Sequence, residues 1–402
     1  YPVAATLYQQ VVDADTKSVV PYIALARISE RQGDTDGLLD WLQQAQEHAP
    51  DDLQPHIFLA KYYLRAGKPV TARKHIRQAL ELAPGEPELL TLSGRSYMVE
   101  KDYRGALQPL QALLQTEPDS QLARILLGES YLQLGRYDDA RRELQHVIEQ
   151  NPRDITAHGL LTNLEIRAGN LEQALDYSRR IKTTYPELFL GYELTGDVQM
   201  AGRRFEEADA EYEMAWERMQ SSALVIKRAE NAIRSGGLDR GVAGLEAWLQ
   251  AHPDDLQVTE YLGTTLQGAG NKSGAIVAYE KVIAASPENA VALNNLAGLY
   301  LEDNRPEALA LAKRAWQAAP DNPGVQDTYG WALVKYGQVG LGLELLEQAA
   351  KSLPDIPEVR YHYAIALYQA GKKEVARKSL RELLKGGLEF EGREDAERLL
   401  QE

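Results

Sequence analysis

Histidines, paired carboxylates and one glycine-rich stretch are the residues of this chain that could support catalysis or hold a metal. The seven histidines form no His-Glu-x-x-His pair, and cysteine is absent, so the sequence indicates neither a metal site nor a cysteine nucleophile. Residues 268–274 look like a phosphate-binding loop, but Lys272 follows asparagine instead of glycine and no strand is expected before it. The sequence therefore predicts a protein that is not an enzyme and carries no cofactor.

The charge balance narrows the classes of partner. The 402 residues include 44 Lys and Arg against 59 Asp and Glu, for a net charge of −15. Non-specific binding of nucleic acid or anionic lipid needs a positive surface field, so neither is expected. No apolar run reaches the roughly 18 residues of a membrane-spanning helix, which predicts no transmembrane segment in this chain.

Prolines recur along the chain at a fixed spacing. The first five are 34 residues apart, the next step is 67, and the last three steps are 34, 33 and 34. The step of 67 skips one position, at Gln220. These prolines are Pro50, Pro84, Pro118, Pro152, Pro186, Pro253, Pro287, Pro320 and Pro354. Such a period is the mark of a repeat architecture.

Small residues and glycines keep the same phase as the prolines. About 24 residues before each proline position stand Ala26, Ala60, Gly94, Gly128, Thr162, Gly196, Ala229, Gly263, Ala297, Gly330 and Ala364. About 12 residues before it stand Ala72, Ala106, Ala140, Ala174, Ala208, Gly241, Ala275, Ala308, Gly342 and Ala376, with Leu38 as the exception. A glycine usually lies between the two, and apolar residues around it follow helical spacing. Each unit is therefore expected to be two closely packed helices, A and B, joined by a short turn.

This pattern resembles the tetratricopeptide repeat (TPR) family. The clearest unit carries Leu127, Gly128, Tyr131, Gly135, Tyr137, Ala140 and Pro152. The resemblance implies an all-α, right-handed solenoid of about eleven helix-turn-helix repeats with a C-terminal capping helix. The repeats are expected to start near residues 19, 53, 87, 121, 155, 189, 222, 256, 290, 323 and 357.

The ends and one weak stretch define the expected domain boundaries. Residues 1–18 fit the second half of a truncated repeat, which indicates a fragment of a longer array; 19–390 hold the eleven repeats, and 391–402 read as the capping helix. Residues 219–245 lack the proline and contain the pairs Ser221-Ser222 and Gly236-Gly237. They are interpreted either as a degenerate repeat within the stack or as a bend between two blocks.

In TPR proteins helix A lines a concave face, and this resemblance supplies the candidate binding residues. They form a basic group near the N-terminus, an acidic group in the middle and an aromatic group near the C-terminus. The partner-binding candidates are Arg27, Arg31, Lys61, Arg65, Arg95, Glu129, Asp197, Glu230, Asn294 and Trp331. The basic group could hold an acidic peptide, a C-terminal carboxylate or an anionic polymer. The alternative is that these side chains are solvated helix faces. The chaperone-type carboxylate clamp is not expected, because Asn294 lacks the lysine that accompanies it in that clamp.

The C-terminal third has a narrower resemblance. Residues 294–297, 319–323, 327–331 and 357–364 resemble the TPR-repeat lipoproteins of bacterial exosortase (PEP-CTERM) systems. That resemblance implies a protein-interaction scaffold in the bacterial periplasm or envelope, for protein sorting or for exopolysaccharide and biofilm assembly, lipid-anchored through a segment upstream of Tyr1. The alternatives are a TPR subunit of a polysaccharide synthesis or secretion complex, and a cytoplasmic adaptor or co-chaperone. Exposed end repeats would also permit end-to-end self-association.

Overall fold

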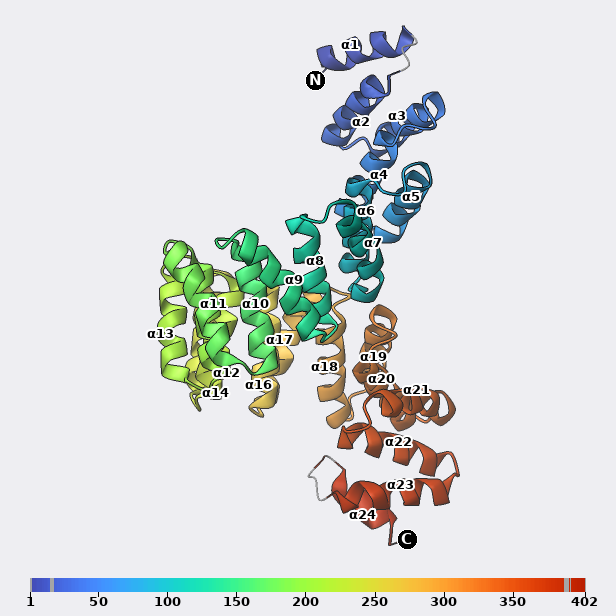
Figure 1. Cartoon of the computed structure of the whole chain (residues 1–402). Helices are drawn as coiled ribbons and strands as arrows, with labels where there is room; N and C mark the ends of the chain where they lie inside the picture. Colours follow the sequence, from blue (N-terminus) through green and yellow to red (C-terminus); the bar gives the residue numbers. More distant parts are fainter. Residues whose placement is uncertain (1, 15–17, 387–389, 391, 402) are drawn as a thin grey trace. The chain divides into compact units, whose positions relative to one another are not determined.

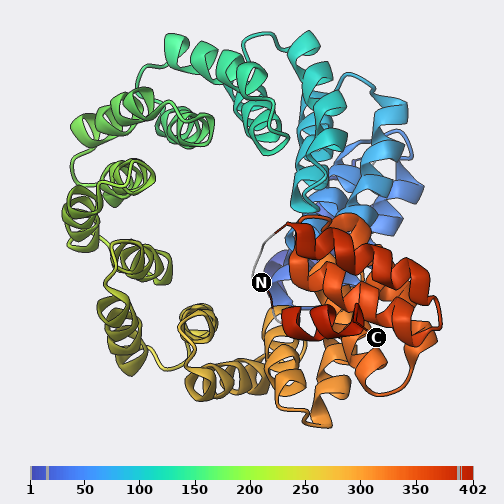
Figure 2. The same ribbon diagram turned by 90° about the horizontal axis from the view of Figure 1, so that it is seen from below.

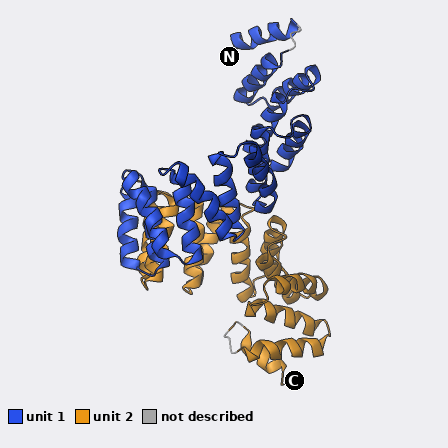
Figure 3. Ribbon diagram, in the orientation of Figure 1, with its two compact units in different colours: residues 1–218 blue, residues 219–402 orange. Residues whose placement is uncertain are grey.

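The computed structural model describes residues 2–14, 18–386, 390 and 392–401, and these residues form 24 helices without a strand (Figure 1). The chain divides into two compact units, residues 1–218 and 219–402 (Figure 3). The division coincides with the start of the weak stretch at 219–245. The bend proposed for that stretch stays a prediction.

Unit 1 is a row of helix pairs that can be followed in chain order from blue to green (Figure 2). Its first helix, α1 (Pro2–Asp13), stands before the pairs. The pairs are α2 (Val20–Gln32) and α3 (Thr35–His48), α4 (Gln54–Arg65) and α5 (Pro69–Leu82), α6 (Pro87–Val99) and α7 (Tyr103–Thr116), α8 (Gln121–Gln133) and α9 (Tyr137–Gln150), α10 (Ile155–Ala168) and α11 (Leu171–Thr184), α12 (Phe189–Ala201) and α13 (Phe205–Trp216).

Unit 2 continues the same arrangement. Its pairs are α14 (Ser222–Arg234) and α15 (Leu238–Ala251), α16 (Leu256–Gly268) and α17 (Lys272–Ala285), α18 (Ala290–Glu302) and α19 (Glu307–Ala318), α20 (Pro323–Lys335) and α21 (Val339–Ser352), α22 (Pro357–Gln369) and α23 (Lys373–Lys385), followed by α24 (Arg393–Leu399). All eleven predicted repeat starts lie at the first residue of a helix or one residue before it. The prediction of an all-α array of about eleven helix-turn-helix repeats is confirmed.

Helices A and B of a repeat come closest to each other at the small residues that stand about 24 and about 12 residues before each proline position. Gly128 of α8 and Ala140 of α9 are both buried. A Cβ added to Gly128 would lie 2.6 Å from Leu144 Cγ, so the leucine fills the space that a side chain would need. The periodic small residues therefore set the distance between paired helices, as the sequence pattern predicts.

The turn between helices A and B uses one left-handed residue. Gly135 has φ 71°, and seven other repeats also have a glycine with positive φ there. The remaining three repeats place Lys101, Arg203 and Asn304 at this position, with φ of 59°, 58° and 53°. The conformation therefore belongs to the turn itself, and glycine is the residue that adopts it without strain.

The repeat that follows the missing proline position, α14 with α15, is held by side-chain hydrogen bonds. Ser221 caps α14 by accepting a 3.2 Å hydrogen bond from the Leu224 amide. Its neighbour Ser222 donates to Asp255 Oδ2 at 2.5 Å, and Trp248 Nε1 donates to the same oxygen at 2.7 Å. Asp255 thus joins α14, α15 and the start of α16, which keeps this repeat in the stack.

The last helix covers the final repeat. Ala396 of α24 and the preceding Phe390 are buried in one cluster with Tyr361 of α22 and with Leu380 and Leu383 of α23. An apolar end face of a solenoid needs such a cover.

Candidate binding surfaces

A basic hollow lies on unit 1 between the first two A helices. Its volume is about 360 Å³. It is lined by Arg27, Glu30 and Arg31 of α2 and by Phe58, Lys61 and Arg65 of α4. Four cations therefore face one carboxylate, in a chain whose net charge is −15. Arrays of exposed Arg and Lys favour carboxylate ligands, with Arg able to bind them in a bidentate manner.

Acidic neighbours neutralise part of this hollow. Glu30 forms an ion pair with Arg65, and Glu88 of α6 forms one with Lys61. The Arg27 guanidinium lies 6.0 Å from the centroid of the Phe58 ring. The fifth predicted cation, Arg95 of α6, is exposed but does not line the hollow. Sequence reasoning thus located four of the five cations in one surface and missed the acids beside them.

None of the described hollows is lined by the predicted acidic residues Glu129, Asp197 and Glu230. Glu129 is half-buried on α8, and burial raises the pKa of its carboxyl. Asp197 of α12 accepts a 2.9 Å hydrogen bond from the hydroxyl of Tyr212. Glu230 belongs to unit 2 and forms an ion pair at 2.6 Å with Arg234 on its own helix. Asp197 and Glu230 thus have local partners, and the acidic segment of the groove stays a prediction.

Asn294 lies half-buried on α18 beside a polar cluster. Its Nδ2 is 3.4 Å from Asn295 Oδ1, and its own Oδ1 is buried with no hydrogen-bond partner among the described residues. Asn295 donates to the Tyr279 hydroxyl at 3.1 Å, and that hydroxyl is 2.8 Å from Gln267 Oε1. This cluster ties α16, α17 and α18 together.

The largest of the described hollows lies in unit 2 around Trp331. Its volume is about 1170 Å³. The indole of Trp331 stacks on the His362 ring with centroids 4.4 Å apart and planes at 14°, and His362 Nδ1 is 2.9 Å from Asp327 Oδ2. Phe390, which precedes α24, and Arg393 at the start of α24 close the other side. The predicted aromatic position is therefore part of a real hollow, and its partners come from the next repeat and the capping helix.

Models of known protein families match most of the chain. Three family models, each describing a tetratricopeptide repeat, match residues 59–122, 97–164 and 197–386. The chain belongs to the tetratricopeptide repeat family. TPR arrays of this kind act as protein-interaction scaffolds.

Two curated relatives share part of this TPR array. A TPR repeat-containing protein of Pseudomonas aeruginosa is 29% identical over 168 residues, which make up 40% of this chain and 28% of that protein. The Vi polysaccharide export protein VexE of Salmonella typhi is 32% identical over 117 residues, or 28% of this chain and 18% of that protein. The chain thus spans less than a third of the length of the curated relatives it matches.

The solved structures show the TPR fold. A tetratricopeptide repeat protein from Parabacteroides merdae matches with a TM-score of 0.54 at 20% sequence identity, covering 62% of this chain and all of that one. At this identity the likeness is evidence for the fold alone.

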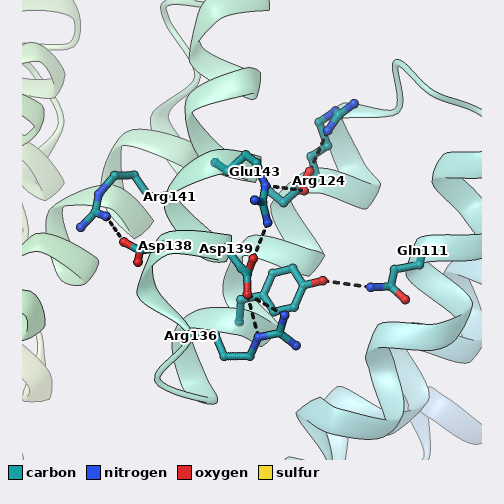
Figure 4. Close-up of polar contacts among 9 residues, drawn as sticks. Gln111, Arg124, Arg136, Asp138, Asp139, Arg141 and Glu143 are labelled. Atoms are coloured by element: carbon teal, nitrogen blue, oxygen red, sulfur yellow. Dashed lines mark hydrogen bonds and ion pairs between the residues drawn. The ribbon is translucent and has the colours of Figure 1, made fainter.

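A dense set of charged residues lies on α8, on α9 and in the turn between them (Figure 4). Arg124 donates to Glu143 at 2.7 Å, and Arg141 donates to Asp138 at 2.8 Å (Figure 4). Arg141 also donates from Nε at 2.7 Å to Glu165, a fully buried carboxylate on α10. The Arg124–Glu143 pair therefore joins the two helices of one repeat, and the Arg141–Glu165 pair fixes that repeat against the next one.

Several residues of the two hollows lie at TPR positions that the sequence reasoning did not use. Phe58 and His362 both occupy the sixth position of their repeats, and Glu30 occupies the twelfth. Lys335 occupies the thirteenth, the same position as Arg31 and Arg65. Adding the twelfth position and the lysine of the thirteenth would have found Glu30 and Lys335, whereas Phe58 and His362 lie outside the positions that the resemblance assigns to the concave face.

Two further properties concern the described part of the chain. No group of three or more His, Asp or Glu residues there is arranged to hold a metal ion. None of its helices has the length and apolar character that a bilayer crossing requires.

Proposed function

We propose that this TPR chain is a non-catalytic scaffold of the bacterial envelope, which holds an acidic segment of a protein partner in its basic hollow. The partner would belong to a machine that exports polysaccharide or sorts surface proteins. The observation that carries the proposal is the convergence of Arg27, Arg31, Lys61 and Arg65 on one surface of a strongly acidic protein.

The chemistry of the hollow supports an acidic peptide as the ligand. Arg27 and Phe58 offer a cation next to an aromatic ring, which accommodates the aliphatic part of a glutamate side chain as well as its carboxylate. The ion pairs of Lys61 with Glu88 and of Arg65 with Glu30 are at the surface. Exposed pairs of this kind contribute about 0–1 kcal/mol, so a ligand carboxylate can compete with them.

The likeness to VexE supports the polysaccharide branch of the proposal. That relative is a polysaccharide export protein by its name, and the shared segment covers 117 residues. A scaffold role in export would place the chain in the envelope, with anchoring supplied outside the repeats.

Binding of a fluorescently labelled octaglutamate peptide tests the hollow directly. The Arg27→Glu/Lys61→Glu variant should bind it at least about tenfold more weakly than the unmodified chain, since two charge-assisted contacts become repulsive. The charge-matched control Arg104→Glu/Arg179→Glu alters two exposed arginines on α7 and α11 and should bind as the unmodified chain does. Equal loss in both variants, or none in either, would overturn the hollow as the site.

The cellular role needs a separate experiment. In the source bacterium, loss of this chain should lower the polysaccharide at the cell surface, and the Arg27→Glu/Lys61→Glu variant should fail to restore it. Partners cross-linked to the unmodified chain but not to this variant would identify the bound protein. Unchanged surface polysaccharide and unchanged surface proteins would contradict the envelope role.

A further inference from the structure

The hollow around Trp331 carries an inference that is independent of the basic hollow. It belongs wholly to unit 2 and is formed by the A helices of the last two repeats and by α24. Its volume of about 1170 Å³ is somewhat above the roughly 300–1,000 Å³ that is typical of sites for a small ligand, which leaves room for a ligand of several linked units.

The lining combines aromatic rings with many polar side chains. Tyr361 and Phe390 are buried, with ring centroids 5.8 Å apart, and Trp331 in front of them remains partly exposed. Seven of the 15 lining residues are polar or charged: Lys335, His362, Gln369, Arg393, Glu394, Asp395 and Arg398. A pocket for a hydrophobic peptide anchor would be mainly apolar. A mixture of an indole and planar hydrogen-bonding groups instead suits a ligand with an apolar C–H face and many hydroxyls.

Two residues one helical turn apart define the chemistry further. Lys335 Nζ lies 5.8 Å from the centroid of the Trp331 ring and donates to the Leu301 carbonyl at 2.9 Å. Within the described part of the chain this exposed ammonium has no ion pair with a carboxylate. Arg398 and Arg393, by contrast, form ion pairs with Asp395 and Glu397. Lys335 is thus the cation that a ligand carboxylate can engage without breaking an existing pair.

The ring of Trp331 is also held in place before a ligand arrives. His362 covers one face of the indole, and the contact of His362 with Asp327, which is buried on α20, fixes the imidazole. Because the platform is rigid, a ligand need not order it on binding, which reduces the entropic cost of association.

We propose that this hollow binds an acidic oligosaccharide, with a sugar ring against the exposed part of Trp331 and a sugar carboxylate on Lys335. The source of such a ligand rests on the proposed role in polysaccharide export. The site itself stands on the Trp331–Lys335 pair and the polar lining. The neighbouring Gln369, Arg393 and Asp395 supply donors and acceptors for the hydroxyls.

Saturation-transfer NMR and calorimetry with tetragalacturonate as the probe test the assignment on the full chain. Trp331→Ala should abolish saturation transfer to the sugar protons. Lys335→Gln should weaken binding at least about tenfold, as expected for loss of one charge-assisted hydrogen bond. Trp316→Phe and Lys313→Gln on α19, both outside the hollow, are the matched controls and should bind normally. Circular dichroism melting of each variant checks that the fold is intact.

Two comparison probes make the test decisive. Chitotetraose, which is neutral, should bind more weakly than tetragalacturonate and should be insensitive to Lys335→Gln. Octaglutamate, which has the charge without the sugar ring, should show no contact with Trp331. The saccharide assignment is overturned if octaglutamate binds this hollow as tightly as tetragalacturonate, if neither saccharide binds, or if binding survives Trp331→Ala.

The two proposals fail in different experiments. Loss of tetragalacturonate binding in Trp331→Ala with octaglutamate binding retained would leave the basic hollow unaffected. Unchanged surface polysaccharide in a strain that lacks the chain would remove the proposed export role, yet it would leave the measured saccharide affinity of unit 2 in place.

Discussion

The phenol ring of Tyr212 on α13 occupies the space above Gly196 on α12. A Cβ added to Gly196 would lie 2.5 Å from Tyr212 Cε1, and the Tyr212 hydroxyl donates a 2.9 Å hydrogen bond to Asp197. Unit 2 repeats this relationship between Tyr279 and Gly263, where the same Cβ would lie 2.9 Å from the ring. In the first repeat the equivalent pair is Ala26 with Leu42, both fully buried. A leucine at this position thus faces alanine in the first repeat and glycine at Gly128, whereas both tyrosine rings lie over a glycine.

This relationship predicts the effect of adding one methyl group. Gly196→Ala should lower the free energy of unfolding by about 1–3 kcal/mol, because the ring is fully buried and must shift. Gly159→Ala on α10 is the control, since its Cβ would meet Leu194 at an ordinary 3.7 Å, and it should stabilise by about 0.5–1 kcal/mol. Urea unfolding followed by circular dichroism measures both.

A double variant checks the explanation. Gly196→Ala/Tyr212→Leu recreates the Ala–Leu pair of the first repeat and should recover most of the loss. The double variant should then be less destabilised than the sum of the two single variants, which is a measurable coupling between the two sites. Additive losses would show that the ring over Gly196 is not the cause.

The three turns without glycine offer a way to stabilise the array. Arg203 has φ 58°, a left-handed conformation that costs a residue with a Cβ about 1–2 kcal/mol. Arg203→Gly should therefore raise the free energy of unfolding by about 1 kcal/mol, after the greater chain entropy of glycine in the unfolded state is subtracted. Gly135→Ala, at φ 71° in the matching turn, should lower it by a similar amount. Thermal melting of the two variants should shift in opposite directions; a shift in the same direction would contradict the turn argument.

The half-buried His75 makes unit 1 sensitive to mild acid. Burial, followed by the nearby His56 and Lys74, lowers the pKa of His75 from 6.5 to about 4. In the folded state the imidazole therefore stays neutral, whereas in the unfolded chain it binds a proton below pH 6.5. The contribution of neutral His75 to the free energy of unfolding is therefore fully present above pH 6.5. It is lost as the pH falls from 6.5 to about 4, and the loss is on the order of 2 kcal/mol.

Replacing His75 should remove most of this dependence. The His75 ring stacks on Tyr63 with centroids 5.6 Å apart and planes at 5°, so His75→Phe preserves the packing without a titrating group. The difference in urea midpoint between pH 7 and pH 4.5 should shrink in this variant. If the difference keeps its full size, the pH response arises elsewhere.

The buried ion pair between Arg141 and Glu165 should matter far more than pairs at the surface. Glu165 is fully buried, and its oxygens accept from Arg141 at 2.7 and 3.1 Å and from Asn170 at 2.7 Å. Arg141→Met would leave this carboxylate without its cation and should cost about 3–5 kcal/mol. The exposed pair of Arg180 and Asp176 at 2.9 Å is the control, and Arg180→Met should cost less than about 1 kcal/mol.

Hydrogen exchange locates the effect of the buried pair. Amides of α9 and α10 should exchange faster in Arg141→Met, while those of α3 and α4 should not change, because each repeat contacts its neighbours only. Neutralising both partners, as Arg141→Met/Glu165→Leu, should restore much of the loss. A uniform increase in exchange across unit 1 would argue against a local role.

The repeats could be predicted from the sequence because they depend on backbone spacing. The distances between Pro118 and Pro152, or between Gly128 and Ala140, fix helix length and helix separation directly. The binding surfaces depend on side-chain positions instead. The pairing of Arg65 with Glu30 joins residues 35 apart, and no periodic pattern specifies which carboxylate a flexible guanidinium will meet.

The largest hollow was only partly predictable for a similar reason. Trp331 was identified from its repeat phase, but the surface around it includes Phe390 and α24, which follow the last repeat and lie outside the period. Its partner His362 belongs to the next repeat, at a position that is mostly apolar elsewhere, as at Phe58. Residues outside the period carry no phase from which their contacts could be inferred.

The uniform left-handed turn has a consequence for how such chains change in length. Because all eleven turns between helices A and B place a left-handed residue at the same position, with or without glycine, each helix pair is a closed module with the same internal backbone conformation. A gene segment that encodes one whole period can therefore be duplicated or deleted while both new junctions stay compatible. The number of modules is then free to vary between related genes, and the ligand surfaces on particular modules can be moved, copied or lost as single cassettes.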